Sequence, residues 1–176
     1  GQKVLITGSG PIGTLCVAAS RRAGAEEIIV TDISKNALTF ANSIGADRVI
    51  NVLEEHDKLQ IYKSNKGYFD IAIECSGSEQ GISDSINCLK PKGTLIQLGL
   101  GGDAVIPLVL VTTKELNLRG SFRFHSEFEL AVNMMKKKLI EVNPLITHKI
   151  EFKNAISGFE LAMNTNKKSL KVQLAF

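Results

Sequence analysis

A glycine-rich segment near the N-terminus is the first residue pattern in the chain whose spacing could bind a ligand. Residues 8–13 read Gly-Ser-Gly-Pro-Ile-Gly, a spacing that indicates dinucleotide binding where a strand precedes it and a helix follows. There Gly8 permits a tight turn, Gly10 lets the backbone approach a pyrophosphate, and Gly13 lets the helix pack close to the strand. Pro11 suits the first helical turn, whose free N–H groups attract phosphate.

An acidic residue follows this segment at a spacing that suits recognition of a ribose. Asp32 lies 19 residues after Gly13, where a carboxylate can accept hydrogen bonds from ribose hydroxyls and repel a 2′-phosphate. This favours NAD over NADP, although Lys35 close by keeps NADP open as a cofactor. The alternative is a turn without a ligand, in which Asp32 is a turn residue or a helix cap. The common register of loop, strand, helix and acid favours the dinucleotide.

Apolar runs that alternate with helical patterns supply the strand and the helix that the motif requires. We predict strands at residues 4–7, 28–31, 49–50, 69–74, 94–98 and 116–122. Helices are predicted at residues 11–23, 34–44, 58–63 and 79–89, and a turn at residues 90–93. This alternation predicts an α/β fold with a doubly wound parallel sheet of the Rossmann type.

The pattern changes near His125, so we divide the chain into a Rossmann domain at residues 1–124 and a C-terminal segment at residues 125–176. Ser126 and Glu129 have the spacing of a capping box and begin a predicted helix that runs to about Lys138. An extended stretch at residues 147–152, a helix from residue 154 to about residue 164 and a strand at residues 170–176 follow.

Composition limits the function classes. The 176 residues, 44% hydrophobic and 22% charged, fit one globular domain with an appended segment. A net charge of +3 favours neither nucleic acid nor a membrane surface as a partner. Three separated cysteines, Cys16, Cys75 and Cys88, form no zinc-ligand pair and no disulfide framework, so reduced thiols and a cytoplasmic location are expected. The start on a strand without an initiator Met suggests part of a longer protein.

Several further segments are similar to the medium-chain dehydrogenase/reductase superfamily, in its zinc-dependent sorbitol (polyol) dehydrogenase branch. Within that branch the chain looks most like the L-idonate 5-dehydrogenases. The similar segments are residues 8–13, 66–70, 74–77, 98–101, 120–124, 144–148 and 171–174. Residues 121–124, Ser-Phe-Arg-Phe, and the tail are more specific than the glycine-rich segment, which many families share.

The resemblance implies roles for a set of residues at the ends of the predicted strands, where ligands bind in such sheets. On the adenosine side of the cofactor these are Ile12 and Asp32. Lining the nicotinamide they are Leu98, Gly99 and Leu100. Flanking the cofactor from the sixth predicted strand they are Ser121, Phe122 and Arg123. Facing the substrate they are Arg123 and Phe124.

Arg123 and its neighbours could also have simpler roles. A guanidinium after a strand can hold a sugar-acid carboxylate in a bidentate fork, but it can equally form a surface ion pair. Phe122 and Phe124 would point to opposite faces of a strand, so we expect at least one of them to pack in the core. Ala37 departs from the family, which often has a basic residue five positions after the ribose-binding acid.

The resemblance also implies parts that lie outside the chain. Relatives bind catalytic zinc through an N-terminal GroES-like domain, which would precede Gly1 and against which the tail would pack. We therefore expect no catalytic residue and no metal ligand in this chain. Cys75, His125 and His148 are instead expected to be a packing residue, a surface residue and a structural residue.

For the whole enzyme the resemblance implies reversible oxidation of a secondary alcohol of a sugar acid or polyol, L-idonate-like or sorbitol-like, by NAD. Zinc would polarise the substrate oxygen, and the cofactor would carry the hydride. This chain alone is expected to bind NAD without turnover. A non-catalytic dinucleotide sensor and a methyltransferase are the alternatives. We expect a homo-oligomer with residues 116–121 as the dimer edge, and a tail that swaps, self-associates or packs back on the sheet.

Overall fold

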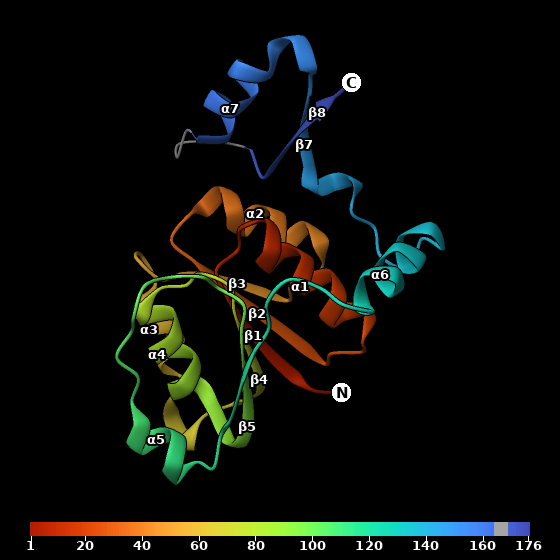
Figure 1. Cartoon of the computed structure of the whole chain (residues 1–176). Coiled ribbons are helices and arrows are strands. Elements are labelled where there is room, and N and C mark those ends of the chain that lie inside the picture. The colour runs from red at the N-terminus through yellow and green to blue at the C-terminus, as the bar shows by residue number, and fades with distance from the viewer. Residues whose placement is uncertain (164–168) are drawn as a thin grey trace.

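A six-stranded parallel sheet forms the centre of the protein in the computed structural model, which describes residues 1–163 and 169–176 (Figure 1). The strand order is β3-β2-β1-β4-β5-β6. The strands are β1 (Lys3–Thr7), β2 (Glu27–Asp32), β3 (Arg48–Asn51), β4 (Phe69–Glu74), β5 (Leu89–Gln97) and β6 (Asn117–Gly120). The predicted fold class and the six predicted strands are confirmed. The strand order reverses between β1 and β4, which is where such sheets open a crevice for a ligand.

Helices cover both faces of the sheet, because neighbouring positions on a strand point to opposite sides. On β1, Val4 and Ile6 pack in the cluster under the helices α1 (Pro11–Arg22) and α2 (Lys35–Ile44). Leu5 packs in the other cluster, under α3 (His56–Gln60), α4 (Glu79–Cys88) and α5 (Leu108–Thr113). None of the helices in the described part of the chain is long and apolar enough to cross a membrane.

Residues with special backbone preferences fix the ends of α2. Ser34 is its N-cap, and the Ser34 hydroxyl accepts a hydrogen bond from the Ala37 N–H at 3.3 Å. Gly45 ends the helix at a φ of +116°, which a residue without a Cβ adopts at little cost. Helix α2 is thereby capped at both ends.

Four local predictions differ from the structure. The turn predicted at residues 90–93 lies within β5, where the register shifts and Lys92 has a φ of +64°. The capping box is wrong: Ser126 makes no capping bond, and Glu127 accepts a hydrogen bond from the His125 N–H at 3.1 Å at the start of α6 (Glu127–Lys136). β6 ends at Gly120, two residues before the predicted end at residue 122. The short helix α5 was not predicted.

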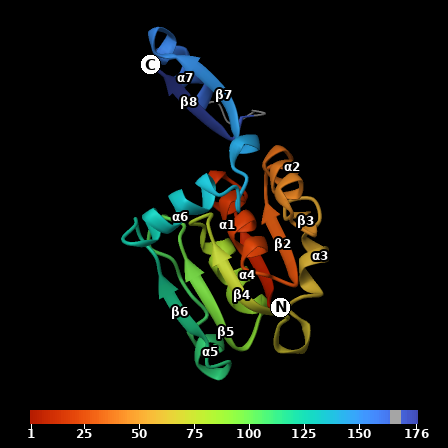
Figure 2. The same cartoon turned by 90° about the vertical axis from the view of Figure 1, so that its right-hand side faces the viewer.

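The C-terminal segment forms a small unit of its own. β7 (Ile146–Glu151) and β8 (Lys171–Ala175) pair in parallel, and α7 (Ala155–Met163) packs beside them. In both views this unit lies away from the central sheet (Figures 1 and 2). α7 leaves Ile156, Phe159 and Met163 exposed. The predicted helix end at about residue 164 falls outside the described residues, and the domain boundary at residue 124 stays a prediction.

Candidate functional site

Two glycines of the glycine-rich loop are required by the fold itself. Gly8 has a φ of +88°, and a Cβ placed on it would lie 2.7 Å from the backbone nitrogen of Ser76, at the end of β4. A Cβ on Gly13 would lie 1.8 Å from the carbonyl oxygen of Gly8. These close approaches let α1 begin directly against the ends of β1 and β4.

Gly10 is different, because nothing in the protein requires a glycine there. Its φ of −65° suits any residue, and a Cβ on it would meet no atom within 4 Å. Gly10 is the N-cap of α1 and gives it no side-chain cap; Pro11 is the first helical residue and Ile12 is exposed. The helix N-terminus thus opens onto space that a Cβ would partly fill. This arrangement fits a phosphate group.

Asp32 connects the glycine-rich loop to the loop after β2. One carboxylate oxygen accepts a hydrogen bond from the Ser9 N–H at 2.5 Å, and the other accepts one from the Ser34 N–H at 2.7 Å. The alternative role as a turn residue is therefore real. It does not exclude the ribose role, because each oxygen retains capacity to accept another hydrogen bond. The Ser9 hydroxyl adds a bond of 2.9 Å to the Ala37 carbonyl.

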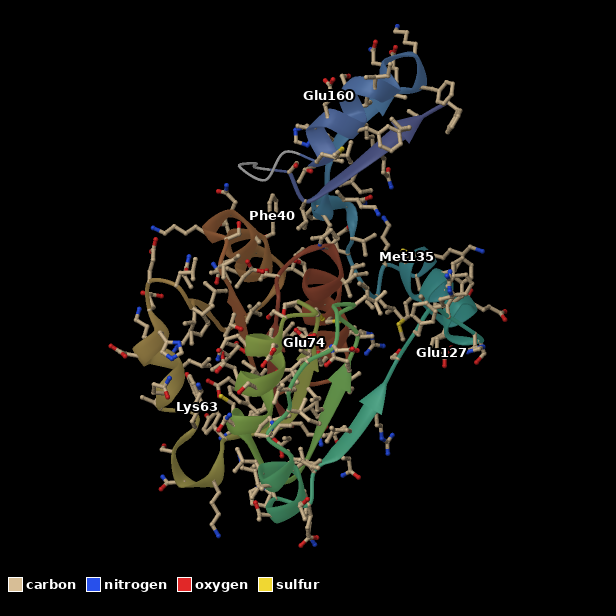
Figure 3. The ribbon with its side chains drawn as sticks, turned by 60° about the vertical axis from the view of Figure 1, so that its left-hand side comes forward. Phe40, Lys63, Glu74, Glu127, Met135 and Glu160 are labelled. Atoms are coloured by element: carbon tan, nitrogen blue, oxygen red, sulfur yellow. The ribbon has the colours of Figure 1, made fainter. Side chains whose placement is uncertain are left out.

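Glu74, the last residue of β4, holds the loop after β4 and the end of β5. The sequence alone did not identify it as a functional residue. Its carboxylate is fully buried and accepts hydrogen bonds from the backbone N–H groups of Ser76, at 2.7 Å, and Gly77, at 3.0 Å. It also accepts one from the Gln97 amide at 2.6 Å and one from the Ser76 hydroxyl. Glu74 lies inside the main body of the protein (Figure 3). The available signal was a lone acid at the end of an apolar strand.

The same residue holds the end of β5. The Glu74 carbonyl accepts hydrogen bonds from the N–H groups of Leu98 and Gly99, both at 2.8 Å. A Cβ on Gly99 would lie 2.2 Å from the Gly77 nitrogen, so the loops after β4 and β5 touch. The predicted nicotinamide wall at Leu98, Gly99 and Leu100 is therefore tied directly to β4.

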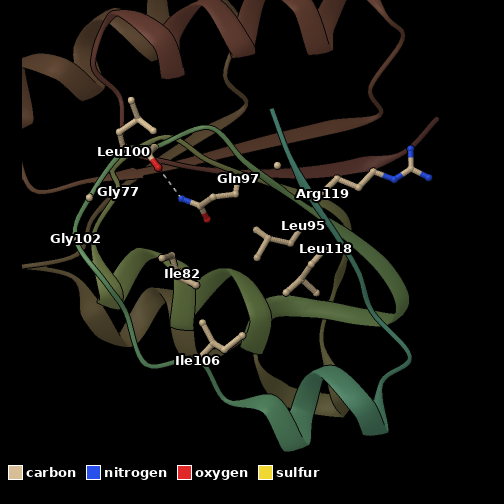
Figure 4. A pocket seen from close by; sticks show the side chains of 12 residues that line it. Gly77, Ile82, Leu95, Gln97, Leu100, Gly102, Ile106, Leu118 and Arg119 are labelled. Atoms are coloured by element: carbon tan, nitrogen blue, oxygen red, sulfur yellow. Dashed lines mark hydrogen bonds between the residues drawn. The ribbon is translucent and has the colours of Figure 1, made fainter. Parts of the chain in front are cut away.

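A cavity of about 370 Å³ adjoins this wall. Gly99 and Leu100 line it, whereas Leu98 does not. The Gln97 amide, on its border, donates a hydrogen bond of 2.9 Å to the Gly99 carbonyl (Figure 4). The rest of its wall is mainly aliphatic, from Ile82, Leu95, Ile106 and Leu118. Such a cavity suits a flat, partly apolar group.

The residues after β6 lie beside this edge but are less enclosed. The Ser121 N–H donates to the Gln97 carbonyl at 3.0 Å. Phe122, Arg123 and Phe124 are all exposed, and the Arg123 guanidinium lies 4.8 Å from the centre of the Phe122 ring. The prediction that Phe122 or Phe124 packs in the core is wrong. The alternation of a strand ends with β6 at Gly120, before either ring.

The loops that carry the predicted cofactor residues therefore lie side by side at the carboxyl ends of the strands. The Ser9 N–H reaches Asp32, Gly8 touches Ser76, and Gly99 touches Gly77. This continuous line crosses the switch point between β1 and β4. An extended ligand with phosphates at its middle matches such a line.

The cysteines and histidines discounted as metal ligands lie on separate elements. The Cys75 thiol is 3.9 Å from that of Cys16, and this hydrogen bond lowers the pKa of Cys16 and raises that of Cys75. His148 on β7 is 3.1 Å from the Thr147 hydroxyl, and His125 precedes α6. Across residues 1–163 and 169–176, no three His, Cys, Asp or Glu side chains are grouped to hold a metal ion.

Comparison with known families places the chain in a class of enzymes. A sequence model described as zinc-binding dehydrogenase matches residues 11–137, more than half of the chain. The chain therefore belongs to the zinc-binding dehydrogenase family, and the resemblance seen in the sequence is confirmed.

Individual relatives are consistent with this assignment. L-idonate 5-dehydrogenase (NAD(P)(+)) of Escherichia coli K12 is 36% identical over 177 residues, which cover 100% of this chain and 51% of that protein. Sorbitol dehydrogenase of Bos taurus is 34% identical over 179 residues, 99% of this chain and 49% of that protein. The crystal structure of the Escherichia coli L-idonate 5-dehydrogenase matches with a TM-score of 0.94 at 35% identity, over 100% of this chain and 50% of that one. The chain spans about half the length of these relatives.

Proposed function

We propose that this chain binds NAD as the coenzyme half of a zinc-dependent dehydrogenase acting on a secondary alcohol of a polyol or sugar acid, L-idonate-like or sorbitol-like. The observation that carries the proposal is the open space at Gly10, before the N-terminus of α1 and beside Asp32. The similarity to an L-idonate 5-dehydrogenase (NAD(P)(+)) of Escherichia coli and a bovine sorbitol dehydrogenase supports a nicotinamide coenzyme and a sugar-acid or polyol substrate.

Each loop at the carboxyl ends of the strands has a separate role in this proposal. The pyrophosphate lies before α1 at Gly10, and Asp32 accepts the adenosine ribose hydroxyls while it holds Ser9. The walls at residues 98–100 and 121–123 hold the nicotinamide end. When bound, the coenzyme supplies hydride transfer, and zinc, whose ligands we place outside this chain, supplies Lewis acidity.

Arg123 and Phe124 are the groups we assign to the substrate. The Arg123 backbone has a φ of +61°, and its guanidinium stacks on Phe122. A planar guanidinium held in this way retains its edge donors for a carboxylate. This favours a sugar acid over a neutral polyol as the substrate.

Calorimetric titration of the chain with NAD and, separately, NADP tests the coenzyme proposal. We expect NAD to bind with the lower dissociation constant, because Asp32 accepts ribose hydroxyls and repels a 2′-phosphate. Preference for NADP would move the 2′-phosphate onto Lys35 and contradict the role of Asp32. Absence of binding to either nucleotide would contradict the proposal, and binding of S-adenosylmethionine instead would indicate a methyltransferase.

We also propose that β6 pairs with the same strand of a second copy. It is an edge strand of the sheet, and its four residues are exposed, with Leu118 among them. Leu118→Lys should convert a dimer into a monomer in sedimentation equilibrium, because it places a charge on the edge strand that the two copies would share. Sedimentation is run without coenzyme, since Leu118 also lines the cavity. The control Ile61→Lys alters an exposed aliphatic residue after α3 and should leave the dimer intact. A dimer that persists in Leu118→Lys would exclude this edge.

A further inference from the structure

An ion pair lies next to the acid that we assign to the ribose. Lys35, the first residue of α2, has its ammonium 2.9 Å from a carboxylate oxygen of Glu54. Lys35 follows Ser34, whose backbone N–H donates to Asp32. Glu54 follows β3, where Asn51 is the register partner of Asp32. The two acids and the cation therefore lie at the carboxyl ends of neighbouring strands.

From this juxtaposition we propose that Glu54 is a specificity-determining residue, which holds Lys35 away from the 2′-phosphate of NADP and so favours NAD. The proposal rests on the coenzyme function proposed above. It adds a residue to the recognition of the coenzyme, because it assigns part of the discrimination to a carboxylate outside the loop that carries Asp32.

The charges around Lys35 explain how Glu54 acts. A 2′-phosphate beside Asp32 needs a cation to offset the repulsion between the two anions. Lys35, at the start of α2, is the first cation after Asp32 in the sequence, but Glu54 neutralises it and adds a second carboxylate. The hydrogen bond to Glu54 also raises the pKa of Lys35, as expected for an ammonium that contacts a carboxylate.

Two further contacts limit what could replace Lys35. The position five residues after Asp32 is Ala37, which has no charge to offer and whose carbonyl accepts from the Ser9 hydroxyl. The Asn51 amide donates to the Ile33 carbonyl at 3.2 Å and joins the loop after β2 to the end of β3. Lys35, at the start of α2, and Glu54, after β3, therefore lie in two segments that this hydrogen bond connects.

The exposure of the pair makes it suitable for a test by substitution. The side chains of Lys35 and Glu54 are 71% and 54% exposed, so removing Glu54 leaves no buried group without a partner. Glu55 is a matched control from the same loop, because its ion pair is with Lys58 and it acts on Lys35 only through a weaker charge interaction. Glu54→Gln and Glu55→Gln remove the same charge, but only the first breaks the ion pair and hydrogen bond of Lys35.

The experiment is calorimetric titration of the 176-residue chain with NAD and NADP, for the wild type, Glu54→Gln, Glu55→Gln and the double variant Lys35→Gln/Glu54→Gln. We expect Glu54→Gln to lower the dissociation constant for NADP about fivefold and to change that for NAD by less than about twofold. The gain should disappear in the double variant and shrink as salt rises from about 0.05 M to about 0.5 M.

The possible outcomes separate this inference from the function on which it rests. An unchanged ratio of the two dissociation constants in Glu54→Gln overturns the role of Glu54, and so does an equal gain in Glu55→Gln or in the double variant. In these cases the wild type still binds coenzyme and the proposed function stands. Binding of neither nucleotide by a wild type that melts cooperatively overturns both.

Discussion

Glu74→Ala is expected to lower the free energy of unfolding of this chain by about 3–5 kcal/mol. The Glu74 carboxylate is fully buried and accepts from two backbone N–H groups, the Gln97 amide and the Ser76 hydroxyl. Its removal leaves these donors inside the protein without an acceptor, which costs about 1–3 kcal/mol for each group that finds no water. Urea unfolding followed by circular dichroism measures the loss.

Two other variants isolate the cause of that loss. Glu79→Ala removes an exposed acid from the first turn of α4, five residues along the chain, and should cost less than about 1 kcal/mol. Glu74→Gln keeps the side-chain volume but turns an amide N–H₂ toward groups that are themselves donors, so it should resemble Glu74→Ala more than Glu79→Ala. A loss below about 1 kcal/mol for Glu74→Ala would show that the donors are not dependent on this carboxylate.

The sheet could be predicted because its strands are buried on both faces. Runs such as those of β1 and β2 are apolar at successive positions, and glycines follow the helices that separate them. Both signals are local in the sequence. The spacing from Gly13 to Asp32 likewise depends only on one βαβ unit, and the structure brings the glycine-rich loop and Asp32 together, with the Ser9 N–H 2.5 Å from the carboxylate.

Features that depend on contacts between distant segments could not be predicted. The Gln97 amide that binds Glu74 comes from β5, 23 residues along the chain, and no periodicity reports that pairing. β6 ends where its pairing with β5 ends, at Gln97 and Gly120, so the apolar pattern through Phe122 overestimated the strand. α5 lacks a side-chain cap, and its apolar run could not be distinguished from a strand.

The glycine-rich loop was predictable as a pattern, but its glycines are required for different physical reasons. The sequence assigned close packing to Gly13 and ligand approach to Gly10. The structure gives Gly13 a contact that excludes any Cβ, and gives Gly10 an ordinary φ with open space. Substitution of Gly10 should therefore affect mainly NAD binding, and substitution of Gly13 mainly the free energy of unfolding.

Gly10→Ala is expected to weaken NAD binding about ten- to a hundredfold while lowering the free energy of unfolding by no more than about 1 kcal/mol. Its methyl group enters only the space assigned to the pyrophosphate, where it blocks charge-assisted hydrogen bonds from the N-terminus of α1. Gly13→Ala is expected to cost about 3 kcal/mol of stability or more, because its Cβ would lie 1.8 Å from the Gly8 carbonyl oxygen and the backbone must move.

Calorimetric titration and urea unfolding of both variants measure the two effects side by side. Loss of binding in Gly10→Ala at wild-type stability can only arise from the space in front of α1, since the protein itself makes no contact there. Full NAD affinity in Gly10→Ala would place the phosphates elsewhere and remove the observation that carries the proposed function. A Gly13→Ala variant with wild-type stability would show instead that the glycine-rich loop can shift to accommodate the methyl group. The close packing of α1 on β1 would then not be what aligns this loop with Asp32.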